Sequence, residues 1–143
     1  MNSTNWDNRF LDMAKLVSTW SKDPSTKVGA VIVDPSNRLI SVGYNGFPKG
    51  VTDDERLFDR DKKYDIIVHA EVNAILFANK TLDGCTMYTS PFQPCPRCAG
   101  LIIQSGIRRV VSIVNSNPRW VEDFSTAKQL LLEAKIRLDI YEE

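Results

Sequence analysis

Residues 69–114 read HAEVNAILFANKTLDGCTMYTSPFQPCPRCAGLIIQSGIRRVVSIV, and the order of elements in this stretch decides the fold. Residues 69–78 are rich in helix formers and nearly all apolar, which predicts a helix sandwiched between other layers. Residues 86–90, TMYTS, predict a short strand. Residues 94–106 predict a helix that starts at a proline and ends at a glycine, and residues 108–115 predict another strand. Strands that alternate with helices pair in parallel through right-handed crossovers.

Upstream of this stretch, the sequence predicts a helix followed by a hairpin. Apolar residues recur there at alternating steps of four and three, as in an amphipathic helix, and Thr4 with Asp7 forms an N-terminal capping pair. These apolar residues are Trp6, Phe10, Met13, Val17 and Trp20. Residues 28–33 predict a strand buried on both faces, and residues 39–44 its antiparallel partner.

The remaining segments complete the predicted sheet and its layers. Charges crowd together between residues 49 and 63, which predicts a solvated loop or short surface helix or, alternatively, a lid over a site. Residues 121–135 predict a last helix, and residues 136–141 alternate as an edge strand does. The sequence therefore predicts one α/β domain over residues 1–143, a three-layer helix-sheet-helix sandwich around a mixed sheet of about five strands.

The composition excludes several classes of protein. Of the 143 residues, 43% are hydrophobic, and 18 Lys and Arg balance 18 Asp and Glu. This is a globular composition, without the basic excess of a nucleic-acid-binding surface. No apolar run approaches the ~18 residues of a membrane span, and the start MNSTNWDNRF lacks the regions of a signal peptide. We therefore expect a cytoplasmic protein with neither a nucleic-acid polymer nor a membrane as partner.

Three side chains have the chemistry of a catalytic zinc site. His69 is the one histidine of the chain, and Cys95 and Cys98 form a Cys-x-x-Cys pair. Residues three apart share a helix face, so both thiols can chelate one ion from the first turn, where the helix dipole favours thiolates. Three protein ligands leave a fourth position open, as a catalytic zinc requires. The remaining cysteine, Cys85, is interpreted as a small buried residue before a strand.

Glu71 is the candidate proton carrier. His69 and Glu71 differ by about 200° around an ideal helix, so both reach one site only from the helix start. We therefore infer two helix N-termini that face each other across the metal, with Glu71 near the ion but not bound to it.

His-x-Glu together with Pro-Cys-x-x-Cys is the signature of zinc nucleobase deaminases. Zinc lowers the pKa of its bound water to about 7. Glu71 is then expected to take a proton from this water, deliver it to ring nitrogen N3, and help the amine leave as ammonia. A competing hypothesis is a non-catalytic zinc protein, such as a nucleotide sensor. It is disfavoured because a structural zinc site is closed by four protein ligands. A free carboxylate beside an open coordination position is instead typical of a catalytic site.

Four motifs follow one another in an order typical of a known family. They are SKDPSTKVGAVIV (21–33), GYNGFPKG (43–50), HAEVNAIL (69–76) and PCPRCAGLIIQSGIRRVV (94–111). Over most of its length the chain resembles the zinc-dependent cytidine and deoxycytidylate deaminases, and among them the deoxycytidylate (dCMP) deaminases. This resemblance implies a cytidine deaminase-like fold and hydrolytic deamination of dCMP to dUMP and ammonia. It also implies that His69, Cys95 and Cys98 bind Zn²⁺ and that Glu71 is catalytic.

The resemblance further implies substrate contacts. Val28 packs on the pyrimidine ring, the backbone N–H of Ala70 faces the pyrimidine O2, and Asn45 contacts the sugar. For Asn45 the residues alone leave a second interpretation open, because Tyr-Asn-Gly after a strand is also ordinary turn sequence.

Two regions have the side chains to bind a 5′-phosphate. One is the turn at residues 21–27, rich in hydroxyls and lysines, and the other is residues 117–120, at the carboxyl edge where open α/β sheets bind ligands. We favour Arg119, whose planar guanidinium binds two phosphate oxygens. The alternative is a solvated arginine beside a packed tryptophan.

Regulation is implied by resemblance alone. The family is often hexameric, activated by dCTP and inhibited by dTTP, so we expect a homo-oligomer and Mg²⁺ bound with a nucleotide triphosphate. Gly43, Tyr44 and Gly46 are the expected effector residues. A second zinc, present in some viral relatives, is not expected, because residues 46–68 contain neither cysteine nor histidine.

Several other substrates stay open. One ring pocket can serve dCTP, a 5-modified dCMP, free deoxycytidine or cytidine. An adenosine deaminase acting on transfer RNA shares the two motifs, but it needs a basic surface. The balanced charge and the acidic segment DDERLFDRDKK at residues 53–63 argue against that activity.

Overall fold

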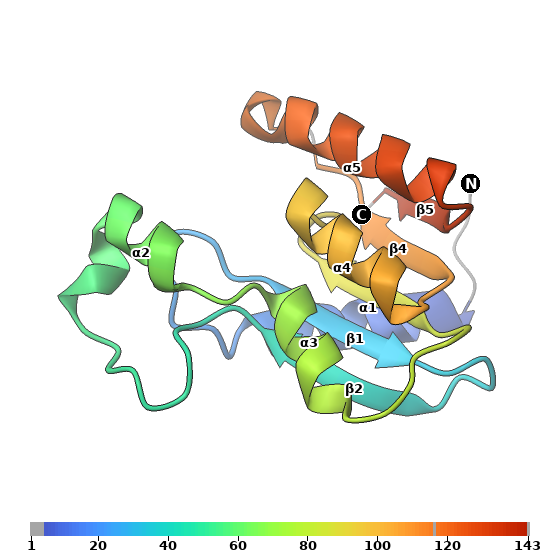
Figure 1. The fold of residues 1–143 in the computed structure, drawn as a ribbon, viewed down its shortest axis with the longest axis horizontal. Coiled ribbons are helices and arrows are strands. Elements are labelled where there is room, and N and C mark those ends of the chain that lie inside the picture. The colour runs from blue at the N-terminus through green and yellow to red at the C-terminus, as the bar shows by residue number, and fades with distance from the viewer. Residues whose placement is uncertain (1–4, 116, 143) are drawn as a thin grey trace.

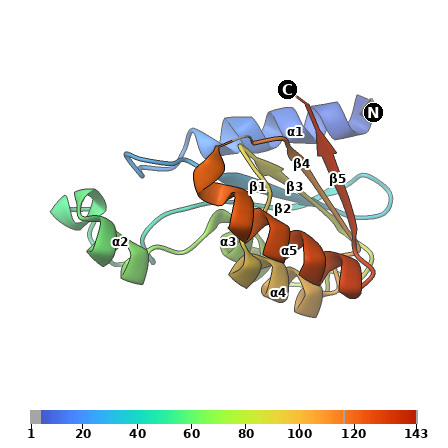
Figure 2. The ribbon, with the colours of Figure 1, turned by 90° about the horizontal axis from the view of Figure 1, so that it is seen from above.

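The structure, a computed structural model, describes residues 5–115 and 117–142. Within these residues a five-stranded mixed sheet lies between two helical layers (Figures 1 and 2). Helix α1 (Asn5–Ser18) covers one face of the sheet. Helices α3 (Ala70–Ala78), α4 (Pro96–Ser105) and α5 (Val121–Glu133) cover the other. The predicted three-layer sandwich is confirmed.

The sheet has the strand order β2-β1-β3-β4-β5. Its strands are β1 (Gly29–Val33), β2 (Leu39–Tyr44), β3 (Thr86–Ser90), β4 (Arg109–Ile113) and β5 (Arg137–Tyr141). Strand β1 pairs antiparallel with both β2 and β3, whereas β3, β4 and β5 are parallel. The two parallel pairs are joined by α4 and α5, and β5 lies at an edge, as predicted.

Strand alternation divides the core into two halves. Val31 and Val33 of β1 pack with α1, whereas Ala30 and Ile32 pack on the side of α3 and α4. All five residues of β1 are buried. This agrees with the prediction of a strand covered on both faces, because successive side chains of a strand point to opposite faces.

Helix α1 packs through a narrower face than its sequence pattern predicts. Phe10, Ala14 and Val17 are buried against the sheet. Trp6 and Trp20 are 46% and 51% exposed, so their assignment to the buried face is wrong. Trp20 lies beyond the end of the helix, and Trp6, near its start, stacks on Phe10 instead. The predicted cap at Thr4 lies outside the described residues.

Helix α3 is covered on one side only. Ala70, Glu71 and Ala74 are buried, whereas Leu76 and Phe77 are 65% and 53% exposed. The prediction of a helix sandwiched between layers is therefore wrong, because the layer of α3 is the outermost one.

A segment between β2 and α3 stands away from the layers (Figure 1). It contains a 3-10 turn, η1 (Glu55–Phe58), and the short helix α2 (Arg60–Ile66). Aspartates cap both elements, since the Asp54 side chain accepts from the N–H of Arg56 and the Asp59 side chain from that of Lys62. The predicted short surface helix is thus present. None of the described helices combines the length and the apolar character of a membrane span.

Candidate active site

The N-termini of α3 and α4 bring the three predicted metal ligands together. The Nδ1 atom of His69 lies 3.3 Å from the Sγ atom of Cys98 and 3.6 Å from that of Cys95. All three ligand atoms lie within 4.8 Å of one another. Two helix starts therefore face each other across one point, as inferred from the motif spacing.

Local backbone geometry explains why these side chains are available. His69 is the N-cap of α3 and Cys95 that of α4, and both have an extended backbone (φ −69°, ψ 153° and φ −73°, ψ 169°). Neither side chain caps its helix, in contrast to the serine or aspartate usual at this position. Pro96 begins α4 with a backbone angle already suited to a helix. Both ligand side chains thus lie at the positive ends of helix dipoles.

The donor set fits zinc. Tetrahedral zinc with ordinary Zn–N and Zn–S bond lengths places a nitrogen and a sulfur ligand about 3.6 Å apart. The two N···S distances in this site agree with that value. A hydrogen bond from Cys98, assisted by His69, lowers the pKa of Cys95 to about 4 against the opposing effect of burial. The hydrogen bond to Cys95 and burial raise the pKa of Cys98, so two thiolates here require a compensating cation.

Glu71 lies in the first turn of α3, beside the ligands. Its side chain is buried, and it is not part of the ligand group found in the described residues. Burial raises the pKa of Glu71 from 4.5 to about 7, against the opposing effects of its own backbone N–H and of His69. A carboxyl group with such a pKa both gives and takes protons at neutral pH.

A cavity of about 800 Å³ opens above these residues. The helix starts form its base. One wall consists of residues from Asp23 to Val28 with Asn45, a second wall of α2 and η1, and a third of Phe92, Trp120 and Phe124. Phe92 packs against both other rings with centroids 5.5 Å apart. The volume suits a nucleotide-sized ligand.

Val28 and Ala70 both lie at this cavity. Val28 is buried immediately before β1, and Ala70 is the first residue of α3. A backbone N–H in the first turn of a helix has no partner within the helix, so that of Ala70 is a donor suited to a ligand.

Asn45 also lines the cavity, but its side-chain amide is already hydrogen-bonded to the cavity wall formed by residues 23–28. Its Oδ1 accepts from the N–H of Val28 at 2.9 Å, and its Nδ2 donates to the carbonyl of Thr26 at 2.9 Å and to Oδ2 of Asp23 at 3.3 Å. Asn45 therefore has a structural role in holding the turn before β1.

Arg119 lines the cavity from the 3-10 turn η2 (Pro118–Trp120). Its side chain is exposed, with the guanidinium carbon 4.8 Å from the ring centre of Trp120. In the alternative phosphate region, Lys27 donates to the carbonyl of Ser21 and Lys22 pairs with Asp53. Asp23, Ser25 and Thr26 of this turn line the cavity, whereas Lys22 and Lys27 do not.

Sequence reasoning missed the basic residues Arg60, Lys63 and Arg97, which also line the cavity. For the first two, a signal was available. Arg60 and Lys63 stand three residues apart within the charged segment, so they share one face of a helix.

The three expected effector residues do not line the cavity. Gly43 lies under α3, where a Cβ atom would overlap the backbone of Ala70 and Ala74. The carbonyl of Tyr44 accepts from the side chain of Asn73 at 2.8 Å. Gly46 exchanges backbone hydrogen bonds with Val68. Packing and pairing thus account for these positions, and their binding of an effector stays a prediction.

The family model for the cytidine and deoxycytidylate deaminase zinc-binding region matches residues 4–114. The matched range contains Glu71 and all three predicted metal ligands, His69, Cys95 and Cys98. The chain belongs to the cytidine and deoxycytidylate deaminase family.

Relatives agree with this membership. The chain is 45% identical over 136 residues to the "Uncharacterized deaminase in luxG 3′ region" of Aliivibrio fischeri, with 93% of this chain and 91% of the relative covered. It is 42% identical over 133 residues to human deoxycytidylate deaminase, with 88% and 73% covered. The structure of the dCMP deaminase of cyanophage S-TIM5 in complex with dCMP and dUMP superposes with a TM-score of 0.78 at 21% identity, covering 98% and 99% of the two chains. The predicted cytidine deaminase-like fold is confirmed.

Proposed function

We propose that this chain is a zinc-dependent hydrolase that converts dCMP and water into dUMP and ammonia. The observation that carries the proposal is a buried Glu71 beside a three-ligand metal group at the base of a nucleotide-sized cavity. The choice of dCMP is supported by the identity of 42% to human deoxycytidylate deaminase.

In this reaction Glu71 moves the protons. His69, Cys95 and Cys98 would hold a zinc ion, which would lower the pKa of a water molecule to about 7 and so provide a hydroxide nucleophile. Glu71 takes the proton from the water and delivers it to N3 of the ring while C4 is attacked. It then takes the proton of the hydroxyl group newly bonded to C4 and passes it to the amino group, so that C4 becomes a carbonyl carbon and the amine leaves as ammonia. The pKa of about 7 suits a group that serves as base and then as acid.

The substrate contacts follow the walls of the cavity. Val28 packs on the ring, and the N–H of Ala70 donates to the pyrimidine O2. Asn45 keeps its bonds to the wall and uses the second lone pair of Oδ1 to accept from the sugar hydroxyl. Arg119 binds the 5′-phosphate with its guanidinium.

We extend the proposal to regulation. The protein is a homo-oligomer, expected to be a hexamer, in which dCTP activates, dTTP inhibits, and Mg²⁺ accompanies the nucleotide. Gly43, Tyr44 and Gly46 are the effector positions, with access from outside the substrate cavity. One catalytic domain and a cytoplasmic location stay predictions from the sequence.

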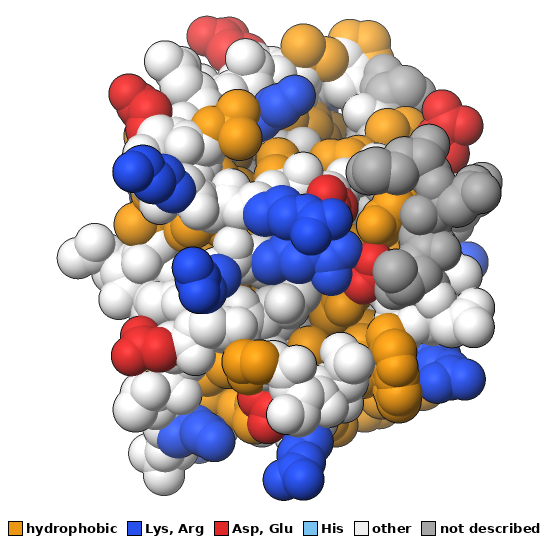
Figure 3. All heavy atoms as spheres, turned by 90° about the vertical axis from the view of Figure 1, so that its right-hand side faces the viewer, with side chains coloured by type: hydrophobic (Ala, Val, Ile, Leu, Met, Phe, Trp, Pro, Cys, Tyr) orange, Lys and Arg blue, Asp and Glu red, His pale blue; other side chains and the backbone are white. Residues whose placement is uncertain are grey.

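A polymeric substrate is less well supported. The chain has no basic excess, since 18 Lys and Arg balance 18 Asp and Glu. The face turned away from α2 and the cavity likewise mixes basic, acidic and apolar side chains, apart from one small basic group near its middle (Figure 3). A transfer RNA requires a more continuous basic surface.

A substrate panel tests the proposal. The zinc-loaded protein is assayed for ammonia release from dCMP, dCTP, 5-methyl-dCMP, deoxycytidine, cytidine and transfer RNA, with and without dCTP or dTTP as effector. We expect the highest kcat/KM for dCMP. Absence of ammonia release from dCMP, or a higher kcat/KM for another substrate, would contradict it.

A further inference from the structure

Helix α2 forms one wall of the cavity without apolar anchoring of its own. All seven of its residues are described and none is buried. Arg60, Lys63 and Tyr64 line the cavity from one side of the helix. Figure 1 shows α2 at a distance from the three layers. Such a helix keeps its place only through specific contacts, since packing stabilises most short helices.

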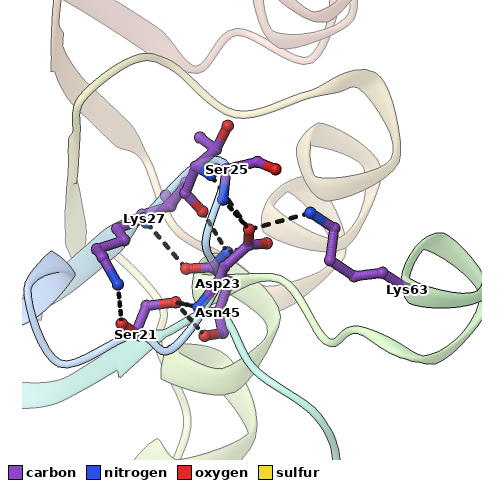
Figure 4. Close-up of polar contacts among 8 residues, drawn as sticks. Ser21, Asp23, Ser25, Lys27, Asn45 and Lys63 are labelled. Atoms are coloured by element: carbon purple, nitrogen blue, oxygen red, sulfur yellow. Dashed lines mark hydrogen bonds and ion pairs between the residues drawn. The ribbon is translucent and has the colours of Figure 1, made fainter. Parts of the chain in front are cut away.

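The specific contact is an ion pair with Asp23. The Nζ atom of Lys63 lies 3.0 Å from Oδ1 of Asp23, a residue 40 positions earlier in the chain (Figure 4). The same oxygen accepts from the N–H groups of Ser25 at 2.8 Å and Thr26 at 3.2 Å. The other oxygen of Asp23 accepts from Nδ2 of Asn45 at 3.3 Å. One carboxylate thus joins α2 to the wall that contains Asn45.

Burial distinguishes the Lys63–Asp23 pair from a second ion pair, Lys22–Asp53, which also joins the turn at residues 21–27 to the charged segment. The side chains of Lys63 and Asp23 are 11% and 5% exposed. Those of Lys22 and Asp53, which pair at 3.2 Å, are 73% and 36% exposed. Solvent-exposed ion pairs contribute little to the stability of the folded state. Removal of one partner of a buried pair destabilises the folded state, because it leaves the other charge buried without compensation. The Lys63–Asp23 pair is therefore the one that matters for the position of α2.

Lys63 is committed to this carboxylate and not to a substrate phosphate. Transfer of the ammonium to a phosphate would leave Asp23 buried without its cation, at high cost. Three other cations of the same cavity can bind a substrate phosphate without leaving a buried carboxylate. They are Arg60, Arg97 and Arg119, whose side chains are exposed.

We propose that the Lys63–Asp23 ion pair is a positioning device for substrate binding, which holds α2 over the cavity and orders the wall formed by residues 23–28 and Asn45. This inference rests on the proposed function, because it assumes that the cavity binds the nucleotide. The pair acts through the walls and not on the reacting atoms, so its loss weakens nucleotide binding and leaves the chemistry at Glu71 unchanged.

Steady-state kinetics of Lys63→Met test this role. We expect KM for dCMP to rise about 10-fold and kcat to change by less than about threefold, the pattern of lost binding without lost transition-state chemistry. Lys63→Arg keeps a cation at the same place and is expected to restore most of the affinity. Lys22→Met is the matched control, because it removes a lysine from the exposed pair between the same segments, and its KM stays at the wild-type value. An unchanged KM in Lys63→Met would overturn the proposal.

A double-mutant cycle separates positioning from direct contact. Asp23→Asn keeps an oxygen for the N–H groups of Ser25 and Thr26 but removes the charge. If the pair acts as a unit, Lys63→Met in the Asp23→Asn background raises KM by less than about twofold. The same increase in both backgrounds would show that Lys63 binds the substrate directly, which contradicts a positioning role.

Hydrogen exchange gives a readout that does not depend on dCMP turnover. In Lys63→Met, backbone amides of residues 23–28 and 60–67 are expected to exchange faster, whereas those of α4 exchange as in the wild type. Unchanged exchange in both walls would refute the positioning role even if dCMP is the substrate. Faster exchange in a protein that does not deaminate dCMP would instead refute the proposed function alone.

Discussion

At the scale of single residues, Glu71 has the property most directly connected to the proposed chemistry. The sequence places it two residues after a metal ligand, but its burial comes from the packing of α3 against the sheet and α4. That burial raises its pKa to about 7, whereas an exposed glutamate would stay deprotonated at neutral pH. The motif supplies the carboxyl group, and the fold supplies its protonation behaviour.

Substitution of Glu71 by glutamine tests this division of roles. Glu71→Gln keeps the size of the side chain but cannot carry a proton, so we expect kcat to fall by about 10²–10⁴-fold. Zinc content, measured by atomic spectroscopy, is expected to stay at about one ion per chain, because Glu71 is not a ligand. Retention of a large part of the wild-type rate would mean that another group moves the protons.

Arg119 is a second residue with a specific expectation. Loss of a charge-assisted bond to phosphate costs about 1.5–3 kcal/mol, so Arg119→Ala is expected to lower kcat/KM for dCMP by about 10²-fold. The small activity on deoxycytidine, which has no phosphate, is expected to stay constant. Equal losses on both substrates, measured side by side, would indicate instead that Arg119 supports the ring of Trp120.

At the scale of elements, the starts of α3 and α4 contain the predicted metal ligands, so we expect these starts to depend on the metal for their stability. Neither N-cap side chain caps its helix, and both belong to the group of side chains that could hold a metal ion. We therefore expect metal binding to stabilise two helix ends at once and its free energy to contribute to folding.

Removal of both thiols tests the coupling between metal and helix starts. The Cys95→Ala, Cys98→Ala double variant is expected to purify without zinc and to lose about 3 kcal/mol of unfolding free energy in urea. Cys85→Ala is the control, since Cys85 is buried outside the ligand group and its replacement leaves zinc content unchanged. Undiminished zinc in the double variant would refute the ligand assignment.

At the scale of the whole molecule, a buried polar cluster joins α1 to three strands on the face away from the active site. Asp7 accepts from Arg109 at 2.9 and 2.8 Å, from Tyr88 at 2.6 Å and from Tyr141 at 3.0 Å. Arg109 also donates to Asp139 at 2.7 Å. Burial acts to raise the pKa of Asp7, but the bonds from Arg109 and Tyr88 outweigh it and lower the pKa from 3.8 to about 2.

Because the pKa of Asp7 is lowered, the free energy of unfolding depends on pH in the acid range. Because the folded state holds the proton of Asp7 less tightly than the unfolded state, this contribution is complete above pH 3.8 and is lost as the pH falls toward 2. The shift corresponds to about 2 kcal/mol of unfolding free energy. In urea unfolding, Asp7→Asn is expected to lose about 3 kcal/mol at pH 7 and to show a smaller acid dependence than the wild type.

A neighbouring aspartate supplies the control for this experiment. Asp12 lies exposed on the same helix, so Asp12→Asn is expected to unfold with nearly the same free energy as the wild type. Equal stability of Asp7→Asn and Asp12→Asn at pH 7 would contradict the role of the cluster.

The sequence by itself determined the order of the main elements, the antiparallel β1–β2 hairpin, the parallel pairing of β3, β4 and β5, and the three candidate metal ligands that the fold brings together. These features depend on local signals: the continuous apolar run in residues 28–33, the proline and glycine that bound α4, and two motifs, His-x-Glu and Cys-x-x-Cys, that each stand at the start of a helix. Local patterns do not record what covers a side chain. The apolar residues of α3 predict burial on all sides, yet Leu76 and Phe77 are exposed because no further layer lies outside them.

Only the tertiary structure decided the walls of the cavity and the electrostatics of the molecule. Lys63 and Asp23 lie 40 residues apart, and Arg109 lies 102 residues from Asp7. Pairs at such separations leave no periodic pattern in the chain, and each partner alone has the sequence context of an ordinary surface charge. Their burial, and with it the positions of Asn45 and α2, follows from the packing of distant segments, because only the folded chain excludes water from both partners at once.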